Sequence, residues 1–313
     1  MGKHRDYGCS SSASVSAPAE SFKHIEDPNS RVISRPRILI LTSLAMIAFA
    51  GNSLLCRAAL KHTVIDPATF TSVRLLSGAI ALWLIVSMRT SSRMRGGSWP
   101  SALALFAYAA AFSFAYVDLS AGTGALLLFG AVQATMILFG LWQGERLNGW
   151  QGIGLAVALG GLVALLLPGL SAPPLHSAIL MVGAGIAWGV YSLRGKGAGD
   201  PLAATTGNFL RAVPFAVILS LVLLTMARVD AEGIAYAIAS GALTSGVGYA
   251  IWYAALRGLK ATSAATVQLS VPVIAAIGGV ILLGEPITLR LLGASIAVLG
   301  GIALVVLRPT PGG

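Results

Sequence analysis

Ten long apolar stretches follow one another along this chain, and they constrain its fold more than any other feature. Each can cross a bilayer, because about 20 helical residues span a hydrocarbon core of about 30 Å. Backbone polar groups in lipid must be satisfied within the segment, so the stretches predict an all-α polytopic membrane protein with ten transmembrane helices. The stretches cover residues 38–60, 67–88, 99–117, 120–142, 149–168, 175–193, 202–227, 231–256, 261–283 and 287–307.

The composition agrees with lipid as the solvent. Of the 313 residues, 56% are hydrophobic and 10% are charged, whereas a typical soluble domain is about 25% charged. These values exclude a soluble enzyme and a disordered protein, and two cysteines, Cys9 and Cys56, provide no disulfide framework. Residues 1–36 are polar and rich in serine, so we expect a disordered tail rather than a signal peptide.

The basic residues predict the orientation in the membrane. With the N-terminus inside, fifteen of the 21 Lys and Arg residues fall in cytoplasmic segments and three fall in outer loops. This asymmetry is a strong positive-inside signal, so both termini, including the tail, should be cytoplasmic. The net charge of +10 therefore reflects topology, and we expect no nucleic-acid partner.

The sequence also repeats itself at an offset near 140 residues. Each copy holds five apolar stretches, and because five is odd the second copy should enter the membrane from the opposite side. Inverted repeats are a common plan of secondary transporters, with the substrate site near the midplane between the halves. The matching pairs are Gly144-Glu145 with Gly284-Glu285, Leu159-Gly160-Gly161 with Leu299-Gly300-Gly301, Arg57 with Arg194, and Arg74 with Arg211.

The second copy carries a set of short motifs. They are Tyr249-Ala-Ile-Trp252-Tyr253-Ala-Ala-Leu256, Ala261-Thr262-Ser263-Ala264-Ala265, Pro272, Gly284-Glu285-Pro286-Ile287-Thr288 and Gly300-Gly301. Together these motifs resemble the EamA unit of the drug/metabolite transporter superfamily. The first copy, residues 38–168, matches that unit less fully than the second, residues 175–307, because Val132 stands where the second copy has Pro272.

Within that superfamily the chain is most similar to YddG-type exporters of aromatic and other neutral amino acids. The resemblance implies a ten-helix exporter in the bacterial inner membrane, working by alternating access on a small-molecule substrate. Export of another small metabolite or a drug is the first alternative. A membrane enzyme or lipid-handling protein is the second, and the chain lacks the catalytic carboxylates, His-Glu-x-x-His motif and Cys/His clusters that it would need.

The predicted spans carry no clear midplane Asp, Glu or His, so the sequence gives no support to proton coupling by a carboxylate. We expect no cofactor, no metal and no catalytic residue. Arg74 and Arg211 are the exceptions among the charged residues, because both fall inside spans. Each could grip a substrate carboxylate, but snorkelling or capping of free carbonyls is the favoured interpretation because both copies have the residue.

Polar and aromatic side chains within the spans are the candidates for a substrate cavity. Such a pocket needs apolar or aromatic walls and a few fixed hydrogen-bonding groups. Packing between helices is the alternative for each aromatic residue. The predicted substrate-binding residues are Asn52, Tyr108, Phe112, Gln133, Trp188, Tyr191, Tyr249, Trp252, Tyr253, Gln268 and Ser270.

Two prolines and two glutamates are predicted to act as hinges or structural residues. Pro214 and Pro272 remove backbone hydrogen bonds inside their spans, so each can kink its helix. Glu145 and Glu285 follow glycines near the start of a helix, where an acid caps free amides. Small residues in spans 149–168 and 287–307 permit close helix packing, either within the chain or in a homodimer.

Overall fold

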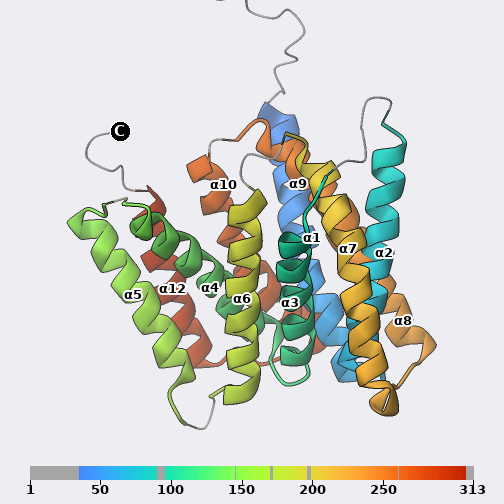
Figure 1. Cartoon of the computed structure of the whole chain (residues 1–313). Helices are drawn as coiled ribbons and strands as arrows, with labels where there is room; N and C mark the ends of the chain where they lie inside the picture. Colours follow the sequence, from blue (N-terminus) through green and yellow to red (C-terminus); the bar gives the residue numbers. More distant parts are fainter. Residues whose placement is uncertain are drawn as a thin grey trace, which may run out of the picture. The chain divides into compact units, whose positions relative to one another are not determined.

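The computed structural model describes residues 35–89, 96–144, 146–169, 172–195, 199–259 and 261–307, and nearly all of the predicted tail lies outside them. The described chain is built from helices joined by short connections (Figure 1). They are α1 (Arg35–His62), α2 (Pro67–Ser87), α3 (Trp99–Ala115), α4 (Ala121–Trp142), α5 (Gly149–Leu166), α6 (Leu175–Gly195), α7 (Pro201–Val222), the short 3-10 helix η1 (Leu224–Met226), α8 (Ala231–Ile238), η2 (Ala239–Val247), α9 (Gly248–Leu256), α10 (Ala261–Gln268), α11 (Ser270–Leu283) and α12 (Leu289–Leu307).

The described residues form nine helical segments that are long and apolar enough to cross a membrane. The tenth predicted span is α3, a shorter apolar helix of 17 residues. The chain is thus a multi-pass, all-α membrane protein, as its ten apolar stretches predict.

Local sequence explains where several helices begin. Asp66 caps α2 by accepting hydrogen bonds from two backbone N–H groups, and a proline occupies the first helical position. Asp200 and Pro201 do the same for α7, so the two copies start their second helix by the same device. At α5, Asn148 and Gln151 form a reciprocal capping box.

The eighth predicted span differs from a single α-helix. Residues 231–256 form α8, a nine-residue π-helical segment η2 and then α9. Here the backbone of the span meets α2, because a Cβ on Gly241 would collide with the carbonyl of Arg74, and a Cβ on Gly78 would lie 3.1 Å from the carbonyl of Gly241. Hydrophobic periodicity carries no signal for a wider helical turn, so the sequence predicts only an uninterrupted helix.

The ninth predicted span is divided between Gln268 and Ser270, where α10 ends and α11 begins. Pro272 has no N–H with which to bond the carbonyl of Gln268, four residues earlier, which accounts for a break at this point. Pro214 has a different outcome, because α7 continues through it as one helix from Pro201 to Val222.

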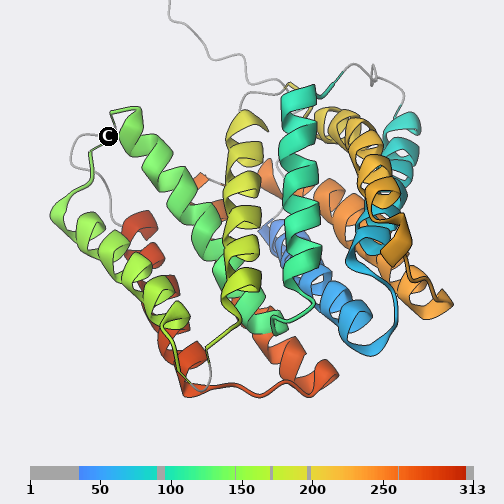
Figure 2. The same cartoon turned by 60° about the horizontal axis from the view of Figure 1, so that its bottom comes forward.

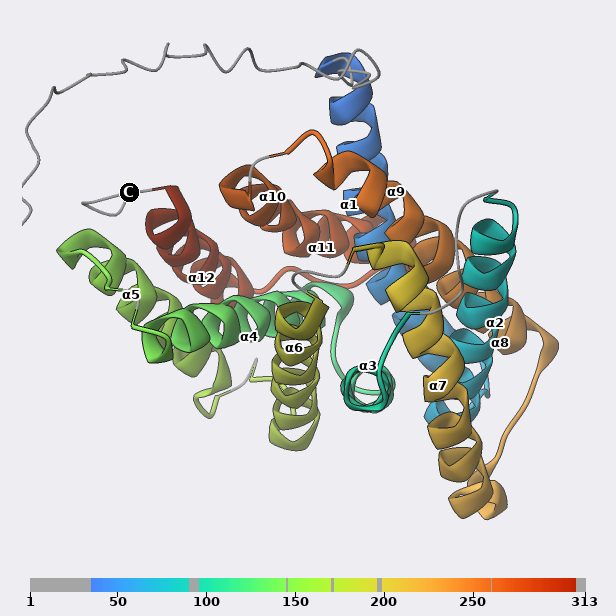
Figure 3. The same cartoon turned by 45° about the horizontal axis from the view of Figure 1, so that its top comes forward.

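The two halves meet along pairs of corresponding helices. α5 packs against α12 and α2 packs against α7, and both pairs lie side by side in Figures 2 and 3. Glycines permit the first contact, since a Cβ on Gly161 would lie 2.7 Å from the Cβ of Ala297 and a Cβ on Gly154 would lie 2.6 Å from the carbonyl of Gly301. At other glycines of these two helices, such as Gly160 and Gly300, an added Cβ would meet no atom of the described residues within 4 Å.

Candidate functional site

A cavity of about 400 Å³ lies between the two halves, lined by residues from both. α1, α3 and α4 contribute from the first half, and α6, α7, η2, α9 and α10 from the second. No Asp, Glu, Lys, Arg or His is among its described lining residues. The lining comprises Phe49, Asn52, Ser53, Tyr108, Phe112, Leu128, Phe129, Val132, Gln133, Met136, Trp188, Tyr191, Ser192, Gly195, Pro201, Ala204, Thr205, Asn208, Thr244, Ser245, Tyr249, Trp252, Tyr253, Leu256, Ala264, Ala265 and Gln268.

The structure brings all the predicted substrate-binding residues to this cavity except Ser270. The Ser270 hydroxyl instead donates to the carbonyl of Val267 at 2.7 Å, next to the break between α10 and α11. The sequence assigns each of these residues to a membrane span but not to a face of its helix. Their assembly around one space depends on how the helices pack.

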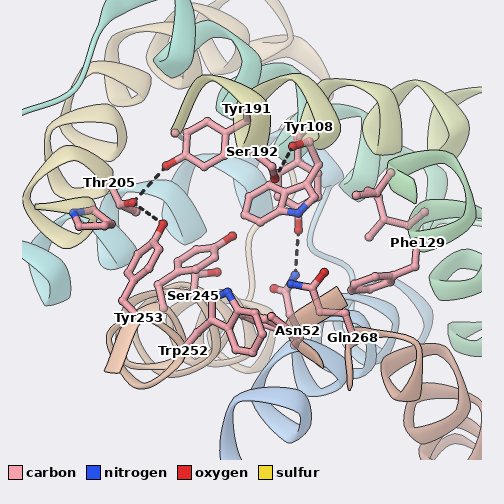
Figure 4. Close-up of a pocket in the computed structure, with 18 of the residues that line it drawn as sticks. Asn52, Tyr108, Phe129, Tyr191, Ser192, Thr205, Ser245, Trp252, Tyr253 and Gln268 are labelled. Atoms are coloured by element: carbon pink, nitrogen blue, oxygen red, sulfur yellow. Dashed lines mark hydrogen bonds between the residues drawn. The ribbon is translucent and has the colours of Figure 1, made fainter. Parts of the chain in front are cut away.

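Aromatic rings form much of the cavity wall (Figure 4). The Trp188 ring has its centroid 4.8 Å from that of Tyr108, and it stacks on Tyr191 at 5.2 Å and on Tyr249 at 5.5 Å. Across the cavity, Phe49 meets Trp252 edge to face with centroids 5.8 Å apart. These flat faces suit an aromatic or apolar solute and can also attract a cation.

One group of hydroxyls ties α6, α7 and α9 together at the cavity wall. The Thr205 hydroxyl lies 2.8 Å from the Tyr253 hydroxyl and accepts from the Tyr191 hydroxyl at 3.3 Å. Asn208 Nδ2 donates to the Tyr191 hydroxyl at 3.4 Å, and Asn208 Oδ1 accepts from the backbone N–H of Ser98 at 2.8 Å. These residues hold the rings in place.

Two carboxamides line the cavity without a hydrogen-bond partner among the described residues. They belong to Gln133 on α4 and Gln268 on α10. In Figure 4, Gln268 lies beside Asn52. Both carboxamides can therefore bond a polar group of a solute.

Asn52, Tyr108 and Arg74 form a buried network at the wall. Asn52 Oδ1 accepts from the Ser240 hydroxyl at 2.7 Å, and Asn52 Nδ2 donates to the Tyr108 hydroxyl at 3.2 Å. Arg74 Nη2 also donates to that hydroxyl, at 3.0 Å. The guanidinium carbon of Arg74 lies 4.7 Å from the ring centroid of Phe112, so Arg74 sits behind the wall rather than in its lining.

Arg211 occupies a different environment from its repeat partner Arg74. Its Nη1 donates to the carbonyl of Gly96 at 2.8 Å and to the carbonyl of Gly207 at 2.9 Å. Arg211 thus caps carbonyls between α7 and the segment before α3. Arg74 is only 2% exposed, and its Nη1 has no hydrogen-bond partner in the part of the chain that the structure describes.

The cavity reaches one end of the helix bundle and not the other. Its lining includes Gly195, Pro201 and Leu256, which lie at helix ends, and Ala264, which lies near the start of α10. We call this end of the bundle the mouth end. No lining residue comes from the opposite end, where α1 and α11 finish and α4 begins. We call this the closed end.

A part-buried ion pair joins several segments at the closed end. Arg57 Nε lies 2.9 Å from Glu285 Oε1, and Arg57 Nη1 donates to the carbonyls of Tyr116 and Val117 at 3.0 and 2.7 Å. Glu285 Oε2 accepts from the backbone N–H of Ala121 at 2.7 Å. These bonds join α1, the connection between α3 and α4, the start of α4 and the segment after α11.

Glu285 caps a helix, but not the helix that follows it in sequence. The position of the glutamate suggests the amides at the start of α12, whereas the amide that it binds is at the start of α4, 164 residues away. Sequence proximity cannot reveal this contact, because the tertiary fold creates it. Glu145, the corresponding glutamate of the first copy, lies outside the described residues.

Several cavity residues are not among the predicted ones. Phe49, Phe129 and Met136 are ordinary apolar residues of long spans, and Thr205, Thr244 and Ser245 are small polar residues of a kind common in membrane helices. None carries a local sequence signal, although the equivalence of the two copies could have indicated helix faces. Among the described residues there is no group of three or more His, Cys, Asp or Glu side chains that could hold a metal ion.

Comparison with known proteins gives one family for almost the whole described chain. Residues 36–167 and 175–307 each match the EamA-like transporter family. An uncharacterized protein of Pseudomonas aeruginosa is 60% identical over 271 residues, covering 86% of this chain and 94% of its own length.

More distant relatives have names that refer to transport. An uncharacterized transporter of Archaeoglobus fulgidus is 25% identical, over 79% of this chain and 92% of its own length. A Streptantibioticus cattleyicolor protein, named as a probable terminal-alkyne amino-acid exporter, is 28% identical over 72% of this chain and 80% of its own length. A solved crystal structure with 17% identity covers 88% of this chain and 98% of its own, with a TM-score of 0.61, and so shares the fold. With both halves matched by the same family model, this chain belongs to the EamA-like transporter family.

Proposed function

We propose that this protein exports a neutral or zwitterionic small solute, most of all an aromatic amino acid, across the bacterial inner membrane. The observation that carries the proposal is the cavity, which has aromatic walls, several fixed hydrogen-bonding groups and no charged residue in the described part of its lining. A ring of the solute can stack on Trp188 and Tyr249, and its polar end can bond Asn52, Gln133 and Gln268. The exporter name of the Streptantibioticus cattleyicolor relative supports an amino acid as the substrate class.

The two halves form an inverted repeat in this proposal. Gly161 approaches Val298, and Gly301 approaches Ala158. The offset of 140 residues converts each of these pairs into the other, as a two-fold axis between α5 and α12 requires. The end of α1 and the start of α6 also lie at the same end of the bundle, so these equivalent helices run in opposite directions (Figure 1).

The difference between the two ends of the bundle supports alternating access. The cavity reaches the mouth end, whereas the Arg57–Glu285 pair fastens the closed end. The loops at the mouth end belong to the basic, cytoplasmic side of the positive-inside prediction, since they carry Arg194 and Arg257. The structure then corresponds to an inward-open state that receives a cytoplasmic solute.

Transport down the solute gradient, without proton coupling, fits the cavity best. A proton relay is usually built from buried ionisable residues, and no carboxylate or histidine is among the described lining residues. A proton gradient should therefore leave the flux of a zwitterion nearly unchanged.

Flux measurements in proteoliposomes test this function. Purified full-length protein should move phenylalanine or tryptophan, and Trp188→Ala should lower the flux at subsaturating substrate by about tenfold or more, because it removes the central stacked ring. Trp142→Ala is the matched control, since that ring is 79% exposed at the end of α4 and should be dispensable. If no member of an amino-acid panel moves or competes, the substrate class is wrong. A large response to an imposed pH gradient would contradict the uncoupled mechanism.

A further inference from the structure

We propose that the Tyr108 hydroxyl, supported by Arg74, binds the carboxylate of the transported solute. This inference rests on the proposed function and adds a recognition site to it. It explains how a cavity whose described lining holds no charged residue can select an amino acid over an amine of the same shape.

The hydrogen bonds around Tyr108 leave its proton available. A tyrosine hydroxyl has one O–H donor and acceptor lone pairs on its oxygen. The oxygen already accepts from Asn52 Nδ2 at 3.2 Å and from Arg74 Nη2 at 3.0 Å. No described residue accepts the proton of Tyr108, and the side chain lines the cavity. In this proposal a carboxylate oxygen of the solute accepts that proton.

Asn52 is held in the orientation that this arrangement needs. Its Oδ1 accepts from the Ser240 hydroxyl at 2.7 Å and faces the Thr244 hydroxyl at 3.4 Å. With the carbonyl side of the amide so occupied, the Nδ2 side faces Tyr108, as Figure 4 shows. Donors thus fill the acceptor positions of the tyrosine hydroxyl.

Arg74 makes this donor favour an anion. The guanidinium is 2% exposed, and neither ion pair of the described residues, Arg57–Glu285 or His176–Asp118, includes it. Its Nη1 is buried without a hydrogen-bond partner. A buried charge without a counterion is costly. A carboxylate bound to the Tyr108 hydroxyl lowers that cost, even though it does not touch the guanidinium directly. Arg74 acts through Tyr108 and is a positioning residue, because it does not line the cavity.

The ammonium group of a bound amino acid meets the aromatic part of the lining. No carboxylate is among the described lining residues, so the ammonium has no salt-bridge partner there. Other aromatic rings of the lining, such as Trp252 and Phe49, supply cation–π attraction in its place. The carboxylate then contributes more to selectivity than the ammonium, and the site takes organic carboxylates with an aromatic or apolar body.

A series of four ligands tests the site in the unmodified protein. Titration calorimetry on the full-length protein compares phenylalanine, phenylalaninamide, 2-phenylethylamine and 3-phenylpropionate. Phenylalanine and 3-phenylpropionate keep the carboxylate and should bind about tenfold or more tighter than the amide and the amine, as expected for a hydrogen bond to a charged group.

Variants then assign the selectivity to Tyr108. Tyr108→Phe should weaken phenylalanine binding about tenfold while changing phenylalaninamide binding less than about twofold, so the ratio of the two affinities approaches one. Tyr116→Phe is the matched control, because it removes a buried hydroxyl that donates to the carbonyl of Ala121 at 3.3 Å and does not line the cavity, so it should leave the ratio unchanged. Arg74→Gln should lower the ratio as well, and Arg74→Lys, which keeps the charge, should restore much of it.

The outcomes separate this site from the proposed function. If phenylalanine binds but the amide and the amine bind equally well, or if Tyr108→Phe leaves the affinity ratio unchanged, the carboxylate site is wrong and the proposed function stands. If none of the four ligands and no other amino acid binds, the proposed function fails and the site fails with it. The ligand series needs no variant, so a Tyr108→Phe protein that does not fold leaves the test intact.

Discussion

The part-buried ion pair at the closed end offers a direct way to test the proposed alternating-access cycle. Glu285→Gln keeps the shape of the side chain but removes its charge. In the structure, Glu285 is 7% exposed and its two oxygens accept from different donors, Arg57 Nε and the backbone N–H of Ala121. Opening of this end in the proposed cycle would separate the helices that both bonds join, so their loss should favour opening.

The contacts set the size of the effect. A glutamine has one carbonyl oxygen, so its NH₂ group must face either Arg57 or Ala121, and both of these are donors. One bond is therefore lost, at a cost of about 1.5–3 kcal/mol, and the retained bond loses the carboxylate charge, which costs about 1 kcal/mol more. The sum is about 3 kcal/mol, which corresponds to a shift of about a hundredfold toward the state open at this end.

Cys56 provides a native reporter for the assay. It is fully buried, directly precedes Arg57 and is the free cysteine of the described residues. In a Cys9→Ser background, a membrane-impermeant maleimide added to the closed-end side of sealed vesicles should label Cys56 slowly. Glu285→Gln should raise the labelling rate by one to two orders of magnitude, roughly in line with the population shift.

Asp118→Asn is the matched control at the same end. Asp118 accepts from Ser177 and pairs with His176, but its side chain is 37% exposed and that of His176 is 73% exposed. Exposed pairs contribute about 0–1 kcal/mol, so this variant should change the Cys56 labelling rate by severalfold at most. Equal Cys56 labelling rates in folded Glu285→Gln and Asp118→Asn protein would contradict a role of the Arg57–Glu285 pair in closing this end.

Two further predictions concern stability. Gly301→Ala should lower the free energy of unfolding by about 1–3 kcal/mol, because the new Cβ would lie 2.7 Å from the backbone nitrogen of Ala158. Gly300→Ala is the control and should be neutral or slightly stabilising, because its new Cβ would meet no described atom within 4 Å. Equal shifts of the melting temperature of the two variants in detergent would contradict this packing. Burial raises the pKa of Asp66, but hydrogen bonds from Thr69, Arg228 and Ala68 outweigh it and hold the pKa below its usual value. The stabilisation by Asp66 is therefore complete above about pH 4 and is lost as the pH falls through the lower folded-state pKa, so Asp66→Asn should flatten the acid limb of the pH–stability curve measured by thermal unfolding.

Much of this protein's fold can be predicted from its sequence, because lipid leaves the backbone few choices. A span of about 20 apolar residues must satisfy its own hydrogen bonds, so hydropathy alone locates the helices. Local capping chemistry then fixes starts such as those at Asp66-Pro67 and Asp200-Pro201. The exceptions are the π-helical segment Ala239–Val247 and the break at Leu269, where backbone geometry departs from the α-helical period.

The candidate cavity shows where such prediction ends. Residue type identifies Trp188, Tyr249 and Gln268 as candidates, since aromatic and amide groups are sparse in the spans. It does not identify Thr205 or Phe49, which look like any other residues of a membrane helix. Rotation of each helix about its axis decides which side chains reach the cavity, and packing against neighbouring helices sets that rotation.

The two intramembrane arginines separate the contributions of sequence and structure most clearly. By sequence, Arg74 and Arg211 are equivalent residues of a repeat, each with the same cost of burial. Tertiary structure gives Arg211 two carbonyls to cap, and gives Arg74 a tyrosine hydroxyl, two aromatic rings and an unpaired nitrogen. Hydropathy and local caps act within single helices, so the amino-acid sequence is enough to predict a membrane chain of two related halves. The partners of each charged group come from helices far apart in the chain, so they depend on how the helices pack.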